Sequence, residues 1–274
     1  MSDIREGKGY MSGLLALSND SVPKMLLVTV VLCLVCSVLV SGAAVYLRPL
    51  QAKNVEMAKR TQILEVAGLM QPDGDVDELF AAVDARMVDL ATGEYSDDVD
   101  AATFDMDVAS RDPVTSVAIP TEQDVAGIGR RARYGAVYLV REDERIETIV
   151  LPVKGYGLWS TMYGFLALEG DARTVKGITF FQHGETPGLG GEIENPRWQA
   201  KWPGKKVYDE AGELRLHVVK GELRPGTPGA DYAVDGISGA TLTANGVSRM
   251  IQYWLGEQGY GPYLERLREA GETT

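Results

Sequence analysis

Ser238 and Thr241 stand close together near the end of the sequence, in the segment DGISGATLT at positions 235–243. Ser238 and Thr241 are separated only by Gly239 and Ala240, and a helical pattern follows them. The N-terminus of a helix carries free backbone N–H groups and the positive end of the helix dipole, so it favours a phosphate group. The small residues leave room for a phosphate, and Thr241 would present its hydroxyl there. The segment therefore indicates either a helix cap or a covalent attachment point.

A helix over 242–258 is predicted to position this segment. Its apolar residues recur at helical spacing and would face a core: Val247, Met250, Ile251, Trp254 and Leu255. A cap would account for one hydroxyl residue. It would not account for the whole run from Asp235 to Thr241.

Two earlier segments combine glycines with large apolar side chains. The first reads KGYGLWS at 154–160 and continues as TMYGFLAL to position 168. The second reads GETPGLGGE at 184–192 and is followed by NPRW at 195–198. Glycines allow the backbone to approach a ligand closely, although turn chemistry or core packing would explain any one of these residues.

Together these segments resemble one known family. The run SGAT at 238–241, preceded by Asp235, resembles the flavinylation motif of FMN-binding domains, whose last threonine carries FMN through a phosphoester bond. The two glycine-containing segments, and LRPLQ at 47–51, are similar to the C subunit of the sodium-translocating NADH:quinone oxidoreductase. The resemblance extends from about position 22 to the C-terminus and is weakest over 73–124.

The resemblance implies an electron-transfer subunit of a bacterial inner-membrane complex that couples the oxidation of NADH by ubiquinone to sodium export. FMN would be bound covalently on Thr241, and the subunit would relay electrons without itself binding NADH. The implied partners are the other subunits of the complex and a flavin transferase that takes FMN from FAD. The soluble domain would face the periplasm.

The residue types in the two loops are suited to a flat flavin ring. Tyr156, Trp159 and Leu189 can supply apolar faces, and Thr186 can hydrogen-bond the polar ring edge. Lys154 could stabilise a reduced, anionic flavin. Close approach of backbone N–H groups is expected at Gly155, Gly157, Gly188, Gly190 and Gly191. The phosphate side is expected to involve Ser238, Gly239 and Ala240.

Two other functions stay open at this point. The equivalent FMN subunit of an ion-translocating ferredoxin:NAD oxidoreductase complex shares the SGAT site, although GLWSTM and ENPRW favour the sodium pump. A flavin-free, membrane-anchored scaffold would use Thr241 only as a helix cap. Absorbance in the flavin bands after denaturation would separate a flavoprotein from a scaffold.

Composition limits the remaining function classes. The chain has 274 residues and a formal net charge of −12, so a nucleic-acid partner is not expected. No metal-ligand cluster, nucleophile triad or Rossmann glycine motif is present. His183 and His217 are the only histidines. We expect His183 at the end of a strand and His217 within one.

One segment is suited to a lipid bilayer. Met25 to Leu47 contains no charged residue, and at about 1.5 Å per residue it would extend roughly 34 Å. Lys24 and Arg48 flank this segment, and it contains Cys33 and Cys36, whose ordinary role would be helix packing. A cleaved signal peptide is the alternative, but the apolar run is longer than usual for one. The flanking charges do not indicate which side the domain occupies.

The order of predicted elements indicates an α+β protein with one N-terminal transmembrane helix. A polar tail at 1–24 precedes the span at 25–47. A helical linker, 49–69, and an acidic region of solvated surface and loops make up 48–132. The core of the FMN-binding domain is expected at 133–274. Its strands are predicted at 134–141, 145–153, 163–168, 175–182, 214–219 and 231–234, with helices at 196–202, 242–258 and 262–270.

Overall fold

The structure is a computed structural model that describes residue 18 and residues 21–71, 74–101, 103–224 and 226–272. The chain divides into two compact units, Met1–Glu56 and Met57–Thr274. Most of the expected polar tail at 1–24 lies outside the described residues.

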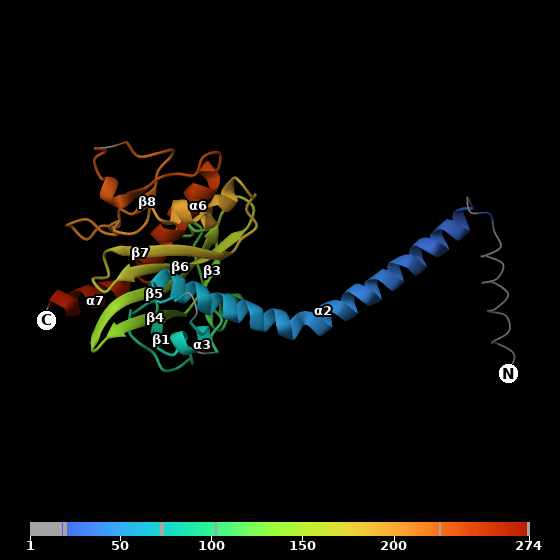
Figure 1. The fold of residues 1–274 in the computed structure, drawn as a ribbon, viewed down its shortest axis with the longest axis horizontal. Coiled ribbons are helices and arrows are strands. Elements are labelled where there is room, and N and C mark those ends of the chain that lie inside the picture. The colour runs from blue at the N-terminus through green and yellow to red at the C-terminus, as the bar shows by residue number, and fades with distance from the viewer. Residues whose placement is uncertain (1–17, 19–20, 72–73, 102, 225, 273–274) are drawn as a thin grey trace. The chain divides into compact units, whose positions relative to one another are not determined.

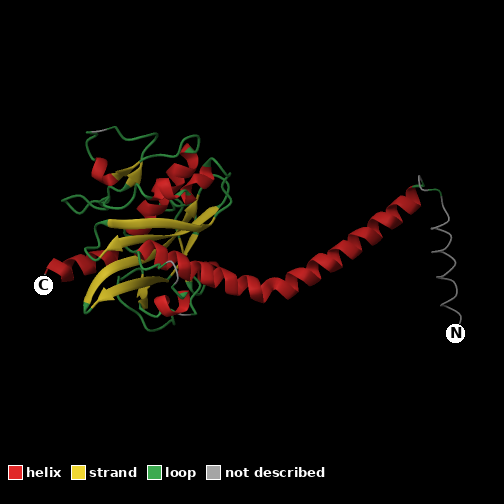
Figure 2. Ribbon diagram, viewed as in Figure 1, coloured by secondary structure: helices red, strands yellow, loops and turns green. Residues whose placement is uncertain are grey.

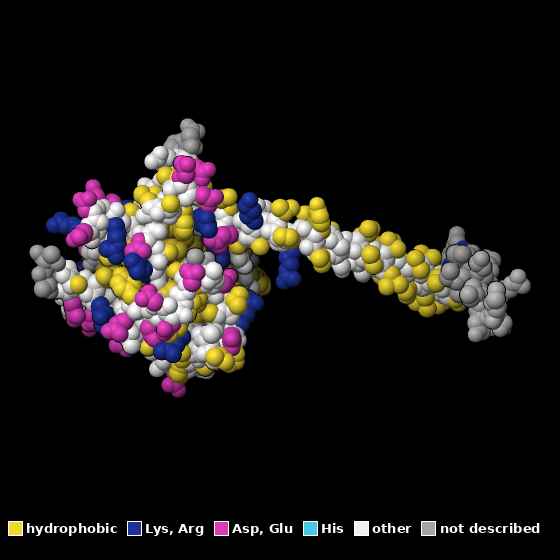
Figure 3. Space-filling view, turned by 90° about the horizontal axis from the view of Figure 1, so that it is seen from below, with side chains coloured by type: hydrophobic (Ala, Val, Ile, Leu, Met, Phe, Trp, Pro, Cys, Tyr) yellow, Lys and Arg dark blue, Asp and Glu magenta, His cyan; other side chains and the backbone are white. Residues whose placement is uncertain are grey.

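Helix α2 (Val22–Ala67) contains the predicted span. It is long and apolar enough to cross a membrane, and among the described residues its apolar window is exposed. Figure 3 shows hydrophobic side chains along its exposed surface. Pro49 lies inside this helix, and the residues with the predicted helical pattern at 49–69 are helical as far as Ala67, as part of the same helix. The helix continues without a break into the second unit.

A five-stranded antiparallel sheet forms the centre of the second unit (Figures 1 and 2). The strand order is β1-β4-β5-β6-β7. The strands are β1 (Val83–Asp89), β4 (Tyr134–Glu142), β5 (Arg145–Tyr156), β6 (Thr161–Glu169) and β7 (Val175–Gln182). The four strands predicted between 134 and 182 are confirmed, and strand β5 continues three residues beyond its predicted end. The α+β class is confirmed as well.

Strand β1 is the main element that the sequence did not predict. It lies in the acidic region and pairs with β4 along its whole length. Its acidic side chains find basic partners nearby: Asp84 pairs with Arg141, and Asp89 pairs with Arg133. The interpretation of 73–124 as only solvated surface and loops is therefore wrong.

Both faces of the sheet are covered. Successive side chains of a strand point to opposite faces, and buried side chains occur on each face. Val150 and Phe165 pack against the end of α2 at residues 63–67. Leu151 and Leu166 belong to the other core, together with helix α6 (Thr241–Leu255). Two neighbouring residues on one strand therefore face different cores.

Short elements complete the fold. In the acidic region, helices α3 (Val76–Phe80) and α4 (Met106–Arg111) are capped by Asp75 and Asp105. Strands β2 (Ser116–Ala118) and β3 (Arg130–Ala132) pair with each other. The 3-10 turns η1 (Gly190–Glu194) and η2 (Ala230–Tyr232), helices α5 (Pro196–Gln199) and α7 (Gly261–Glu272), and strands β8 (His217–Val218) and β9 (Ala233–Val234) follow. The strands predicted at 214–219 and 231–234 thus shorten to a two-residue parallel pair.

Candidate functional site

Helix α6 begins at Thr241, directly after the turn at residues 238–240, here called the glycine turn because Gly239 is at its centre. Ala240 occupies the capping position, and in the part of the chain that the structure describes no side-chain cap hydrogen bond forms at this end of the helix. The interpretation of Ser238 or Thr241 as a simple helix cap is therefore wrong. The first N–H groups of a helix have no partner within it, so the uncapped end offers donors to an anion beside Thr241.

The three hydroxyl residues of the segment differ in exposure. Ser238 and Thr241 are exposed, whereas Thr243 is fully buried. The Thr243 hydroxyl donates a hydrogen bond of 2.6 Å to Oε2 of Glu185. Only Ser238 and Thr241 are therefore accessible to a modifying enzyme.

The glycine turn lies against the second predicted loop. Gly239 has a left-handed backbone conformation, with φ of +74°, which favours glycine. A Cβ atom at position 239 would lie 3.0 Å from Cδ2 of Leu189. The structure therefore brings Leu189 next to the SGAT turn, although about 50 residues separate them in the sequence.

Glu185 connects all three predicted segments, and sequence reasoning missed it. Its Oε1 accepts hydrogen bonds from the backbone N–H groups of Leu158, Trp159 and Ser160, at 3.0, 2.9 and 3.3 Å. Its Oε2 accepts from Thr243 on α6. In the reverse direction, Gly184 donates its N–H to Oγ of Ser160 at 2.6 Å. The sequence signal was an acidic residue within the glycine loop GETPGLGGE.

These hydrogen bonds keep the Glu185 carboxyl group ionised. Burial by itself would raise its pKa, but the bonds from Thr243 and from the backbone N–H groups outweigh burial and hold the pKa below the ordinary value of 4.5. A lowered folded-state pKa stabilises the protein at pH values above the ordinary pKa. That contribution is lost as the pH falls through the lowered value.

Several glycines expected to face a ring make room for protein groups instead. A Cβ at position 157 would lie 2.5 Å from Oε1 of Glu185, and one at position 190 would lie 2.7 Å from its Oε2. A Cβ at Gly155 would lie 2.7 Å from Cβ of Met250 on α6. Gly190 is therefore required for the packing of Glu185, which is a different role from the predicted ring contact. Gly188, with φ of +74° and open space at its Cβ position, is the glycine of this loop that faces outward.

Large apolar side chains in the three segments are exposed. Trp159 is 65% exposed and Leu189 is 45% exposed. Tyr156 is also exposed, and its hydroxyl donates to the carbonyl oxygen of Trp159. Leu242, directly after Thr241, is exposed as well. Thr186 is exposed in the same loop as Leu189. These side chains offer apolar surface to a planar ligand.

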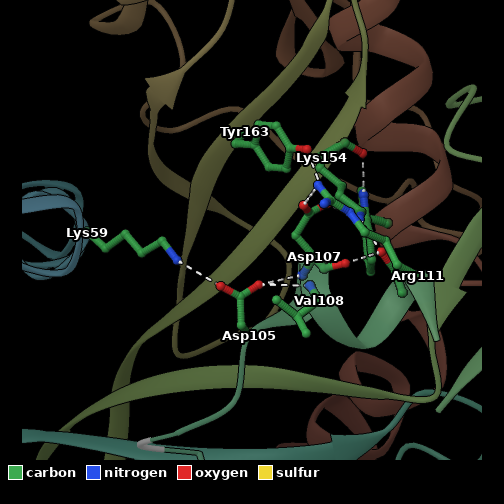
Figure 4. A network of polar contacts seen from close by, with 9 residues as sticks. Lys59, Asp105, Asp107, Val108, Arg111, Lys154 and Tyr163 are labelled. Atoms are coloured by element: carbon green, nitrogen blue, oxygen red, sulfur yellow. Dashed lines mark hydrogen bonds and ion pairs between the residues drawn. The ribbon is translucent and has the colours of Figure 1, made fainter. Parts of the chain in front are cut away.

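Lys154 does not join this group. Because side chains alternate along β5 and Gly155 faces α6, Lys154 points to the opposite face of the sheet. It is 4% exposed, and its Nζ atom lies 2.8 Å from Oγ of Ser110 and 3.1 Å from Oδ1 of Asp107 (Figure 4). These contacts do not support the predicted role of Lys154 beside a reduced flavin.

Asp107 is the centre of this separate cluster. It also pairs with Arg111 and accepts a hydrogen bond from Tyr163 (Figure 4). Burial would raise its pKa, but the hydrogen bond and charge of Lys154 outweigh burial and lower it. Asp105, two residues earlier, pairs with Lys59 of α2 at 3.8 Å. The cluster therefore joins α4 to β5 and to the end of α2.

Asp235, the first residue of the motif, holds the turn in place. Its carboxylate pairs with Lys201 at 2.6 Å and accepts the Leu223 N–H at 2.7 Å. Its carbonyl oxygen accepts the indole N–H of Trp198 at 2.8 Å. This contact joins the ENPRW segment to the motif. His183 lies just after β7, as expected, and its Nδ1 accepts the Glu185 N–H.

Comparison with known proteins links this arrangement to named relatives. The model of a family described as FMN-binding domain matches residues 157–256. A Pseudomonas aeruginosa protein, named as the C subunit of a Na(+)-translocating NADH-quinone reductase, is 48% identical over 92% of this chain and 98% of its own length. Proteins of the same name from Vibrio vulnificus and from Neisseria meningitidis serogroup B are 50% identical, over 93% and 92% of this chain and 98% and 97% of their own lengths.

Solved structures with the same fold cover most of the chain. The crystal structure of Shewanella oneidensis NqrC has a TM-score of 0.72 at 33% identity, and it covers 80% of this chain and 99% of that one. A crystal structure of the C subunit of the Na(+)-translocating NADH-quinone reductase from Parabacteroides distasonis has a TM-score of 0.61 at 29% identity. The match covers 80% of this chain and 96% of that protein's chain.

Proposed function

The chain belongs to the family of C subunits of the Na(+)-translocating NADH-quinone reductase, and from this premise we propose that it carries FMN covalently on Thr241 and relays electrons through it. It is an FMN-binding subunit of a membrane oxidoreductase complex. The proposed bond is a phosphoester between the Thr241 hydroxyl and the FMN phosphate. The names of the relatives favour the sodium-translocating complex over the ferredoxin:NAD complex.

One observation carries the proposal: an exposed threonine at an uncapped helix N-terminus, with exposed Leu189 packed beside its glycine turn. The fit to FMN can be judged from these residues. The uncapped helix end suits the phosphate, and the apolar side chains nearby suit a planar ring. Gly239 has no side chain that would fill the space between the helix end and these apolar side chains. The residues present therefore fit FMN.

When bound, FMN supplies the electron-transfer chemistry. The residues of this chain would hold and shield it. Thr241 fixes the phosphate to the first turn of α6, and the backbone N–H groups there offset its charge. Trp159 and Leu189 would exclude water from the ring, which strengthens the surrounding polar interactions. A covalent tether keeps the cofactor at a high effective concentration.

The chain is associated with a membrane as part of its complex. We propose that residues 25–47 span the lipid bilayer, that the second unit lies in the periplasm, and that the complex exports sodium ions. The other subunits would supply and accept the electrons. A flavin transferase would attach the FMN during maturation.

The purified chain should keep its flavin after denaturation. Protein produced together with the complex and its maturation enzyme is precipitated with acid, washed and redissolved. We expect the flavin absorbance bands to stay with the chain, because a covalent bond survives loss of the fold. A peptide containing Thr241 should carry the added mass of FMN. A colourless precipitate with an unmodified peptide would favour the membrane-anchored scaffold.

Leu189→Ala should alter the flavin without releasing it. The substitution opens one face of the proposed ring site to water but leaves Thr241 untouched. Because water stabilises the charge added on reduction, the midpoint potential should rise. A contribution of about 1–2 kcal/mol corresponds to a shift on the order of 40–90 mV for one electron. Redox titration of the purified chain measures the shift.

Val114→Ala is a suitable control for this prediction, because Val114 is an exposed aliphatic residue on a different loop. It should change neither the flavin content nor the potential. If Leu189→Ala also left the potential and the flavin spectrum unchanged, the loop at 184–191 would not contact the ring.

A further inference from the structure

Glu185 is an unusual buried carboxylate. It is 5% exposed, and within the described ranges no lysine, arginine or histidine forms an ion pair with it. A buried charge without a counter-ion is costly unless hydrogen bonds compensate for the loss of water. Glu185 has four such bonds, three from consecutive backbone N–H groups and one from Thr243. The surrounding chain is therefore arranged around this carboxylate.

The glycines on either side support this interpretation. Gly157 and Gly190 approach Oε1 and Oε2 so closely that a Cβ at either position would overlap the carboxylate. They come from two different loops, so both loops have a close-packed contact with the same side chain. Consecutive backbone N–H groups pointing at one oxygen form an anion-binding concavity. Here the anion is part of the protein itself.

We infer that Glu185 is the positioning residue of the FMN site. Its carboxylate holds the Leu158–Ser160 turn and its own loop against the first turn of α6. It would not touch FMN; it would act by holding the segments that carry Trp159 and Leu189 beside the ring tethered to Thr241. The identity of the ring as FMN rests on the proposed function, whereas the hydrogen bonds of Glu185 do not depend on it.

Loss of the Glu185 carboxylate should therefore change how the flavin ring is held without preventing the attachment of FMN to Thr241. Thr241 is the first residue of α6, which is anchored by its own buried residues, including Val247, Met250 and Ile251. Loss of the Glu185 charge would loosen the two loops but leave this helix in place. The FMN would then stay attached, while its ring would be held less rigidly and would be more open to water.

The test compares four variants of the full-length chain, purified in detergent after production with the complex and its transferase. Glu185→Gln keeps the size of the side chain but removes its charge. Thr243→Val removes the hydroxyl donor and keeps Glu185. The double variant combines them. Glu222→Gln is the matched control, because it makes the same change of charge at an exposed side chain.

Amide hydrogen exchange at residues 158–160 reports the contact directly. Because hydrogen bonds to a charged group are worth about 1.5–3 kcal/mol, exchange there should be about tenfold or more faster in Glu185→Gln. Thr243→Val should give a smaller increase. The double variant should resemble Glu185→Gln rather than the sum of the single effects, because both substitutions disrupt one network. Glu222→Gln should match the wild type.

The spectrum and the midpoint potential of the flavin report how firmly its ring is held. We expect normal covalent FMN in Glu185→Gln and Thr243→Val, together with weaker visible circular dichroism and a shifted midpoint potential. Unchanged exchange and unchanged circular dichroism in both variants would overturn the inference. Faster exchange with an unchanged flavin signal would also overturn it, because Glu185 would then have only a structural role. If the wild type itself carried no FMN, the proposed function would fail, and the exchange data alone would decide whether Glu185 holds the loops.

Discussion

Thr241→Ala should abolish covalent flavin completely. The substitution removes the one hydroxyl at the start of α6, and no side chain at position 240 or 242 can replace it. Electron transfer from NADH to quinone by the assembled complex should fall in the same proportion. Stability should change by about 0.5 kcal/mol or less, since Thr241 is exposed. In-gel flavin fluorescence after denaturation, mass spectrometry of the peptide and a thermal melt measure these effects.

Three related variants locate the bond. Thr241→Ser retains a hydroxyl and should keep part of the modification. Ser238→Ala and Thr243→Val should remain flavinylated, because Ser238 is outside the helix and the Thr243 hydroxyl is buried against Glu185. Covalent flavin in Thr241→Ala together with its loss in Ser238→Ala would move the attachment site to Ser238.

Alkaline phosphatase fused after Thr274 should be fully active in cells. That reporter folds only in the periplasm, where its disulfides can form. The apolar window of α2 supports a single span, which would place the two ends of the chain on opposite sides of the membrane. The expected difference between a periplasmic and a cytoplasmic reporter is essentially all or none, so the experiment decides the orientation.

The flanking charges make this experiment necessary. Arg5, Lys8 and Lys24 precede the span, whereas Arg48, Lys53, Lys59 and Arg60 follow it. The positive-inside rule therefore does not favour a periplasmic domain. β-Galactosidase fused at the same position is the control and should be inactive. The reverse pattern, with an active β-galactosidase and an inactive phosphatase, would place the domain in the cytoplasm.

The fold could be predicted where the signal is local in the sequence. The apolar window of α2 needs only its own composition to be recognised. Strands β4 to β7 show the composition of strands bounded by turns, so their positions were predicted to within a few residues. Strand β1 was missed because its aspartates resemble a solvated surface. Their arginine partners, Arg133 and Arg141, lie 44 and 57 residues away.

The sequence by itself determined the long apolar segment, the α+β class and the small, hydroxyl-bearing turn at the start of α6. Each depends on residues that are neighbours in the chain, where composition and spacing act directly. The face of the sheet on which Lys154 lies depends on how β5 packs against α6, and no local pattern in the sequence specifies that packing. The role of Glu185 depended on contacts with Leu158 and Thr243, 27 and 58 residues away. Those partners meet only when the sheet, the two loops and α6 have packed together, because a carboxylate is buried only where the folded chain supplies enough hydrogen-bond donors.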